Sequence, residues 1–226
     1  PGHGDTAEDS HYTLPAVHHD RARLDSVELL PFKRYIYDGY AGVMTGHLYV
    51  PALDKARNKP VSMSRAVVTD LLQKELGFRG LCFTDALAMK GATTRKSDNP
   101  SVMALLAGND ILLAPAAPIN DFAAVKEALE EGILDREEIE AKIIKILQYK
   151  YIAGLNDYRP VETKGLSERL NSPHAAWLAA KLNEEAITLL KNEGDIIPLK
   201  QLDKKKIAAL SIGCLLYTSD AADDLI

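Results

Sequence analysis

Three short, uninterrupted apolar segments constrain the fold of this chain more than any other feature. They are residues 42–47, 80–85 and 110–113, and glycine or aspartate begins each of them. Amphipathic segments with helical periodicity lie between them. A strand that is apolar throughout is typical of a parallel sheet covered by helices on both faces. The sequence therefore predicts an α/β fold with alternating strands and helices.

The predicted helices set the size of this sheet. They span residues 24–38, 64–75, 100–107, 122–131 and 136–151. Pro31 is expected to kink or restart the first helix, and Ser64 is expected to cap the second. Three strand–helix units cannot close a barrel, which needs eight. Residues 1–155 are therefore either a small open sheet or the C-terminal part of a (β/α)8 barrel.

The sequence becomes more polar after Gly154. Residues 156–174 are polar and are predicted to be a linker, which Ser172 and Pro173 end by starting a helix over residues 175–191. A turn at residues 195–199 and a strand at 207–213 follow. We interpret residues 175–213 as the start of a second α/β domain.

The last residues, CLLYTSDAADDLI, resemble a translated sequencing adapter, so residues 214–226 are expected to be non-native. Without Asp220, Asp223 and Asp224 the net charge changes from −5 to −2. With no basic block, the chain is not expected to bind nucleic acid. No apolar run is long enough for a membrane helix. Cys82 and Cys214 imply no disulfide framework. Compartment and oligomeric state stay open.

Asp85 is the first candidate for chemistry, because it ends a predicted strand. Active sites of parallel barrels lie at the C-terminal ends of the strands, where a carboxylate can act as nucleophile, base or metal ligand. The alternative is a helix N-cap, since aspartate is a preferred capping residue.

Asp9-Ser10-His11 is the second candidate. Side chains two residues apart in an extended segment point to the same side, so the carboxylate can orient the imidazole for acid/base work. The alternative is a solvated loop. Ser10 as a nucleophile is not favoured, since nothing in the sequence places a base beside it.

A cluster of potential metal ligands lies in the same region, made up of His3, Asp5, His11, His18 and His19. Their spacing matches no ligand pattern, so no metal is expected. His47, at a strand end, is expected to be packed and hydrogen-bonded rather than catalytic. Met89 either packs or lies near the pocket of Asp85.

Five ordered motifs carry a family resemblance. They are PGHGDTAEDSH, VMTGHLYVPALD, GFRGLCFTDALAM, ALLAGNDILLAP and LNEEAITLLKNEGDIIPL. Together they resemble the β-N-acetylglucosaminidase (β-N-acetylhexosaminidase) branch of glycoside hydrolase family 3, over about residues 1–213. The resemblance implies a (β/α)8 TIM barrel followed by a second domain.

The resemblance also implies site roles. Asp85 corresponds to the nucleophile, His11 to the acid/base and Asp9 to its dyad partner, while His3 and Met89 are expected to contact the sugar. The implied activity is retaining exo-hydrolysis of terminal β-linked GlcNAc from peptidoglycan or chitin-type fragments, without metal or organic cofactor. The alternatives are a β-glucosidase, a GlcNAc phosphorylase, a metal-dependent hydrolase and a non-catalytic carbohydrate-binding barrel.

The sequence departs from the family pattern at its start. The family's K-H-F should precede Pro1, and the residues of the first five strands are expected upstream of it. A half barrel would expose apolar faces that those strands cover. The chain as written is therefore expected to be an inactive, poorly folded fragment.

Overall fold

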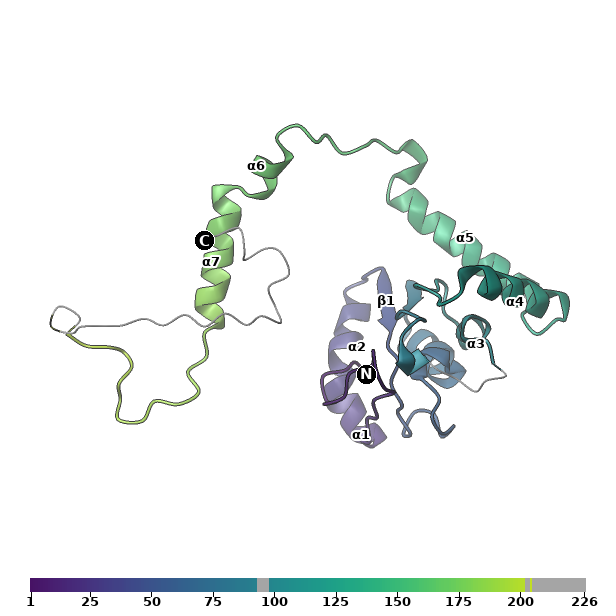
Figure 1. Cartoon of the computed structure of the whole chain (residues 1–226), viewed down its shortest axis with the longest axis horizontal. Helices are drawn as coiled ribbons and strands as arrows, with labels where there is room; N and C mark the ends of the chain where they lie inside the picture. Colours follow the sequence, from purple (N-terminus) through teal and green to yellow (C-terminus); the bar gives the residue numbers. More distant parts are fainter. Residues whose placement is uncertain (93–97, 202–203, 205–226) are drawn as a thin grey trace. The chain divides into compact units, whose positions relative to one another are not determined.

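The structure, a computed structural model, describes residues 1–92, 98–201 and 204 (Figure 1). The chain divides into two compact units, Pro1–Arg159 and Pro160–Ile226. The strand predicted at residues 207–213 and the tail at 214–226 lie outside the described residues.

A parallel pair of strands forms the centre of the first unit. Strand β1 (Gly42–Thr45) pairs with β2 (Leu81–Thr84), with Gly42 opposite Leu81 and Thr45 opposite Thr84. The parallel arrangement predicted from the apolar runs is confirmed. Because both strands run in the same direction, their C-terminal ends lie at one edge, where Asp85 follows β2 directly.

The third predicted strand, residues 110–113, is wrong as a strand. It forms a single parallel bridge, between Phe83 and Ile111. Main-chain hydrogen bonds join Ile111 to Cys82 and Thr84. On either side of them a side chain replaces a main-chain group: the Asp110 carboxylate accepts the Cys82 N–H at 2.8 Å, and the Thr84 hydroxyl accepts the Leu113 N–H at 2.9 Å. The segment therefore follows the sheet edge without extending the regular ladder.

The helical segments of the first unit surround this pair. They are α1 (Arg21–Arg23), η1 (Leu24–Glu28), α2 (Leu30–Tyr37), η2 (Val61–Met63), η3 (Ala66–Glu75), η4 (Lys90–Ala92), α3 (Pro100–Ala107), α4 (Pro118–Glu130), α5 (Arg136–Ile152) and η5 (Leu155–Asp157). Pro31 lies in the first turn of α2, so the predicted restart of the first helix is confirmed.

Ser64 does not cap the second helix as predicted. The helical segment η3 begins at Ala66, and the Ser64 hydroxyl donates to the Asp54 carboxylate at 2.5 Å. The main-chain carbonyl of Ser64 still accepts the N–H groups of Val67 and Val68.

Apolar side chains from both strands and their flanking helices form the core beside the sheet. One buried cluster joins Val43 of β1, Cys82 of β2 and Val68 and Leu72 of η3. Tyr35 and Ile36 of α2 pack against it, and Figure 1 shows α2 running beside β1. This packing holds the ends of both strands in fixed positions.

The second unit contains the short helix α6 (Leu166–Leu170) and the helix α7 (Pro173–Ala186). Ser172 caps α7 by accepting the Ala175 N–H, as predicted, but the helix ends at Ala186 rather than at residue 191. The predicted linker contains α6 as well as loop. None of the helices in the described part of the chain has the length and apolar character that crossing a membrane requires.

Candidate active site

Asp85 lies directly after β2, and hydrogen bonds hold both its main chain and its side chain. Its N–H donates to the Thr45 carbonyl of β1 at 2.9 Å, and its carboxylate Oδ1 accepts the Ala86 N–H at 2.8 Å. No helix starts at Asp85, so the capping interpretation does not apply. The hydrogen bond from Ala86 holds the carboxylate at the C-terminal end of the sheet, where it faces open space.

The buried side chain of His47 contacts the main chain next to Asp85. Its side chain is fully buried, with Nε2 3.1 Å from the Ala86 carbonyl and Nδ1 2.7 Å from the Ser62 hydroxyl. Nε2 therefore carries the proton and donates to Ala86, while Nδ1 accepts from Ser62. The expectation that His47 is packed and hydrogen-bonded is confirmed, and the neutral ring fixes the peptide that follows Asp85.

Burial lowers the pKa of His47 below its ordinary value of 6.5. In the unfolded chain the ring takes a proton near pH 6.5, whereas in the folded chain it resists protonation. The free energy of unfolding should therefore fall as pH decreases below that value. His47→Gln keeps a donor for Ala86 and should flatten this dependence, measured by urea unfolding at several pH values. His174→Gln, on α7, is the matched control and should leave the dependence unchanged.

Asp9 and His11 form a contact, but not in the extended segment that the sequence predicts. The segment is a turn, in which the N–H groups of Tyr12 and Thr13 donate to the Asp9 carbonyl. The Asp9 carboxylate Oδ1 accepts the His11 N–H at 2.9 Å and lies 2.7 Å from His11 Nδ1. This Asx turn brings the pair together more closely than strand geometry would.

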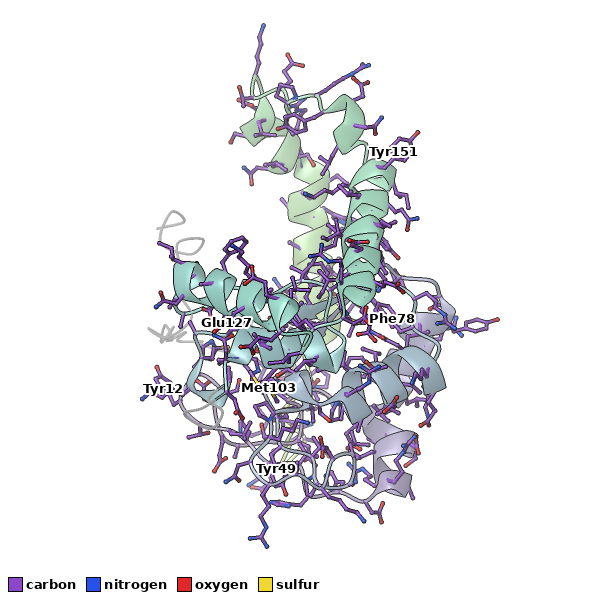
Figure 2. All side chains as sticks on the ribbon, turned by 90° about the vertical axis from the view of Figure 1, so that its right-hand side faces the viewer. Tyr12, Tyr49, Phe78, Met103, Glu127 and Tyr151 are labelled. Atoms are coloured by element: carbon purple, nitrogen blue, oxygen red, sulfur yellow. The ribbon has the colours of Figure 1, made fainter. Side chains whose placement is uncertain are left out.

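The hydrogen bonds from His11, first through its main-chain N–H and then through its ring, lower the pKa of the Asp9 carboxyl. Asp9 is therefore ionised at neutral pH and accepts a hydrogen bond from the Nδ1–H group of His11. That leaves Nε2 as the nitrogen that can exchange a proton with a bound molecule. Both side chains are more than half exposed. Tyr12, which follows the pair, reaches outward at the edge of the view in Figure 2.

The loop that carries this pair is tied to the segment that follows Asp85. The N–H groups of Lys90 and Gly91 donate to the carbonyls of His11 and Ser10 at 3.3 and 3.1 Å. The buried Ser10 hydroxyl lies 2.9 Å from His3 Nε2. A base does lie beside Ser10, which the sequence did not indicate. Because Ser10 is buried, this contact holds the loop in place.

Gly91 leaves no room for a side chain. A Cβ there would lie 2.8 Å from the Ser10 carbonyl oxygen, 2.9 Å from that of Thr13 and 3.0 Å from the His47 Cβ. Gly91→Ala should destabilise the fold by about 1–3 kcal/mol, because main-chain atoms must shift. The check is urea unfolding beside Gly4→Ala, where a Cβ meets nothing within 4 Å. Equal stability of the two variants would contradict the prediction.

The candidate residues meet at one hollow of about 390 Å³. Its lining includes His3, Asp9, His11 and Asp85. His3 and Asp85 also border a second, apolar hollow of about 210 Å³. Met89 is buried and does not line the first hollow. The structure therefore brings four of the five predicted site residues together and leaves Met89 in the packing.

The predicted cluster of potential metal ligands separates into different environments. His3 and His11 belong to the hollow with Asp85, whereas Asp5 and His19 contact each other beside Glu28. The sequence analysis missed Glu28 and Gly91. Gly91 lies six residues after Asp85 without any local motif, and only the contact between two loops gives it a role.

Comparison with known proteins places this geometry in a family. The family profile described as "Glycosyl hydrolase family 3 N terminal domain" matches residues 1–149. Beta-hexosaminidase A of Pseudoalteromonas piscicida is 34% identical in an alignment 223 residues long, which covers 88% of this chain and 36% of that protein. A beta-N-acetylglucosaminidase/beta-glucosidase of Cellulomonas fimi is 26% identical over 88% of this chain and 37% of its own length.

A solved structure shares the fold. The glycoside hydrolase family 3 beta-N-acetylglucosaminidase from Paenibacillus sp. str. FPU-7 superposes with a TM-score of 0.76 and 35% sequence identity, over 85% of this chain and 37% of that one. This chain thus spans little more than a third of the length of these relatives.

Proposed function

The chain belongs to glycoside hydrolase family 3, with the α/β architecture of its TIM-barrel-type N-terminal domain, and from that membership we propose that it supplies the reacting residues of a retaining β-N-acetylglucosaminidase. The substrate would be a terminal β-linked GlcNAc of peptidoglycan or chitin-type fragments. Relatives named beta-hexosaminidase and beta-N-acetylglucosaminidase support this specificity.

The observation that carries the proposal is the contact between Asp9 and His11 on the hollow that Asp85 also lines. Glycoside cleavage with retention requires a nucleophile and a separate proton donor on one site. A fixed carboxylate and an imidazole with one free nitrogen satisfy that requirement. His3, which lines the same hollow, is the proposed contact to the sugar. Met89 is buried, so its proposed contribution is to pack behind the residues that contact the sugar.

In the first step the Asp85 carboxylate attacks the anomeric carbon. The bond from that carbon to the leaving oxygen breaks, and the protonated His11 gives its Nε2 proton to this oxygen. Asp9 stabilises the imidazolium through Nδ1. The product is a glycosyl ester on Asp85 and a free alcohol.

In the second step the neutral His11 removes a proton from water, which attacks the same carbon and releases Asp85. The His11 nitrogen that removes the proton carries no negative charge, unlike the oxygen of a carboxylate base. An anionic acceptor such as phosphate can therefore approach the ester, and phosphorolysis is a second outcome of the same intermediate.

The test compares nitrophenyl β-GlcNAc with nitrophenyl β-glucoside, with and without phosphate and a chelator. Because the relatives are longer than this chain, the assay uses the gene product that carries this segment. We expect faster release from the GlcNAc substrate and continued turnover with chelator. Release only from the glucoside would replace the proposal by a β-glucosidase, an activity that the name of the Cellulomonas fimi relative includes.

Loss of all activity on chelation would favour a metal-dependent hydrolase. Binding of the sugar without turnover would favour a non-catalytic barrel.

For the domain organisation we propose a catalytic segment over residues 1–155, a linker over 156–174 and the start of a second α/β domain over 175–213. Limited proteolysis that cuts within residues 156–174 would support these boundaries.

A further inference from the structure

Glu28, at the end of η1, carries a carboxylate oxygen that no neighbour satisfies. Its side chain is 10% exposed, and its Oε1 accepts from Arg23 at 3.1 Å. Its Oε2 is buried and has no hydrogen-bond partner within the described residues. Buried carboxylate oxygens are normally paired, so an unpaired one points to a ligand at this place.

Two further potential ligands face Glu28. The Asp5 Oδ2 and the His19 Nε2 contact each other, and a donor atom of each lies within 4.8 Å of one from Glu28. A hollow of about 320 Å³ adjoins this group, with Asp5, Arg23 and Glu28 in its lining. Three donor atoms, two from the N-terminal loop and one from η1, therefore converge beside open space.

Asp5 and Glu28 offer carboxylate oxygens to a cation. Two basic groups face these carboxylates: the guanidinium of Arg23, which already lies on Glu28 Oε1, and the amino group of Pro1, which lines the same hollow. The Oε2 of Glu28 is left as an acceptor for a further positive group.

We propose that Asp5, His19 and Glu28 form a site for one divalent transition-metal ion such as zinc. Two carboxylates with one imidazole match the ligands that zinc takes in proteins, with water at the fourth position. Tetrahedral zinc with bonds of about 2.0–2.2 Å holds its ligand atoms about 3.3–3.6 Å apart. Glu28 would therefore move closer to the other two ligands, while Asp5 Oδ2 and His19 Nε2, which are in direct contact, would move apart.

The ion would act on stability rather than on the reaction. Asp5 and His19 lie on the N-terminal loop, and Glu28 lies on η1. A shared ion would fasten that loop to the helical segment, four residues before Asp9. The site does not include His11 or Asp85, so the proposal holds whether or not the glycosidase function does.

The experiment uses the untagged gene product that carries this segment, freed of metal with a chelator. Zinc is titrated by calorimetry, and thermal unfolding is followed with and without zinc. Cobalt(II) is the spectroscopic probe, because its visible absorption reports coordination geometry. The variants are Glu28→Gln and His19→Gln. Glu75→Gln is the matched control, because it also removes a glutamate from an arginine pair, that of Arg21.

We expect one zinc per chain, a higher Tm with zinc and a tetrahedral cobalt spectrum. Glu28→Gln and His19→Gln should each weaken zinc binding by at least about tenfold, while Glu75→Gln leaves it unchanged. Absence of stoichiometric binding would overturn the proposal. So would equal zinc affinity in Glu28→Gln and the unchanged protein. If one variant fails to fold, the other decides by the same comparison.

Discussion

Asp85→Asn should lower kcat on nitrophenyl β-GlcNAc by about 10³-fold or more, because the amide cannot form the glycosyl ester. The fold should persist, since the asparagine oxygen can still accept the Ala86 N–H and the Thr45 and His47 contacts involve main chain. The measurement is steady-state hydrolysis by the gene product that carries this segment, with thermal unfolding as the check on folding. Asp70→Asn, which removes an exposed carboxylate paired with Lys74, is the control.

A second variant identifies the role rather than the importance of Asp85. In Asp85→Gly with added azide, the small anion can occupy the space of the carboxylate and attack the anomeric carbon directly. The product should be a glycosyl azide of inverted configuration, detected by NMR. Activity of Asp85→Asn within tenfold of the unchanged protein would rule out Asp85 as the nucleophile.

His11→Ala should lower turnover of substrates with poor leaving groups by about 10²–10⁴-fold, the usual contribution of a general acid. A dinitrophenyl leaving group needs no proton, so formation of the glycosyl ester from that substrate should be nearly unaffected. Asp9→Ala should give the same pattern with a smaller loss, because it removes only the partner that orients His11. The measurement is kcat/KM across a series of aryl β-GlcNAc substrates.

The slope of that series decides between roles. A steeper dependence on leaving-group pKa in His11→Ala than in the unchanged protein indicates lost proton donation. A uniform loss across all leaving groups would mean that His11 only supports the loop and would remove it from the acid/base role.

The features that depend only on residues close together in the sequence were predictable. Asp85 at a strand end and the Pro31 restart follow from local patterns, and the structure contains both. The pairing of Asp9 with His11 was predicted for a partly wrong reason, since an Asx turn and not an extended segment brings them together.

Features that depend on contacts between distant segments were not predictable. Residues 110–113 are as apolar as a strand, but the main-chain pairing stops at one bridge because the Asp110 and Thr84 side chains take the hydrogen bonds on either side of it. The role of Gly91 depends on the loop that packs against it. Glu28 joins Asp5 and His19 only because η1 ends beside the N-terminal loop. Periodicity and spacing carry no information about such encounters.

The two main-chain hydrogen bonds from Lys90 and Gly91 to the His11 loop have a consequence for how the site loses order. The loop cannot swing away without breaking bonds to the turn that follows Asp85, and that turn cannot shift without pulling on the loop. His11 and Asp85 thus belong to one cooperative unit of local unfolding. Heat or denaturant should therefore remove both proposed functions together, and the amide protons of Lys90 and Gly91 should give the same free energy of opening in hydrogen exchange.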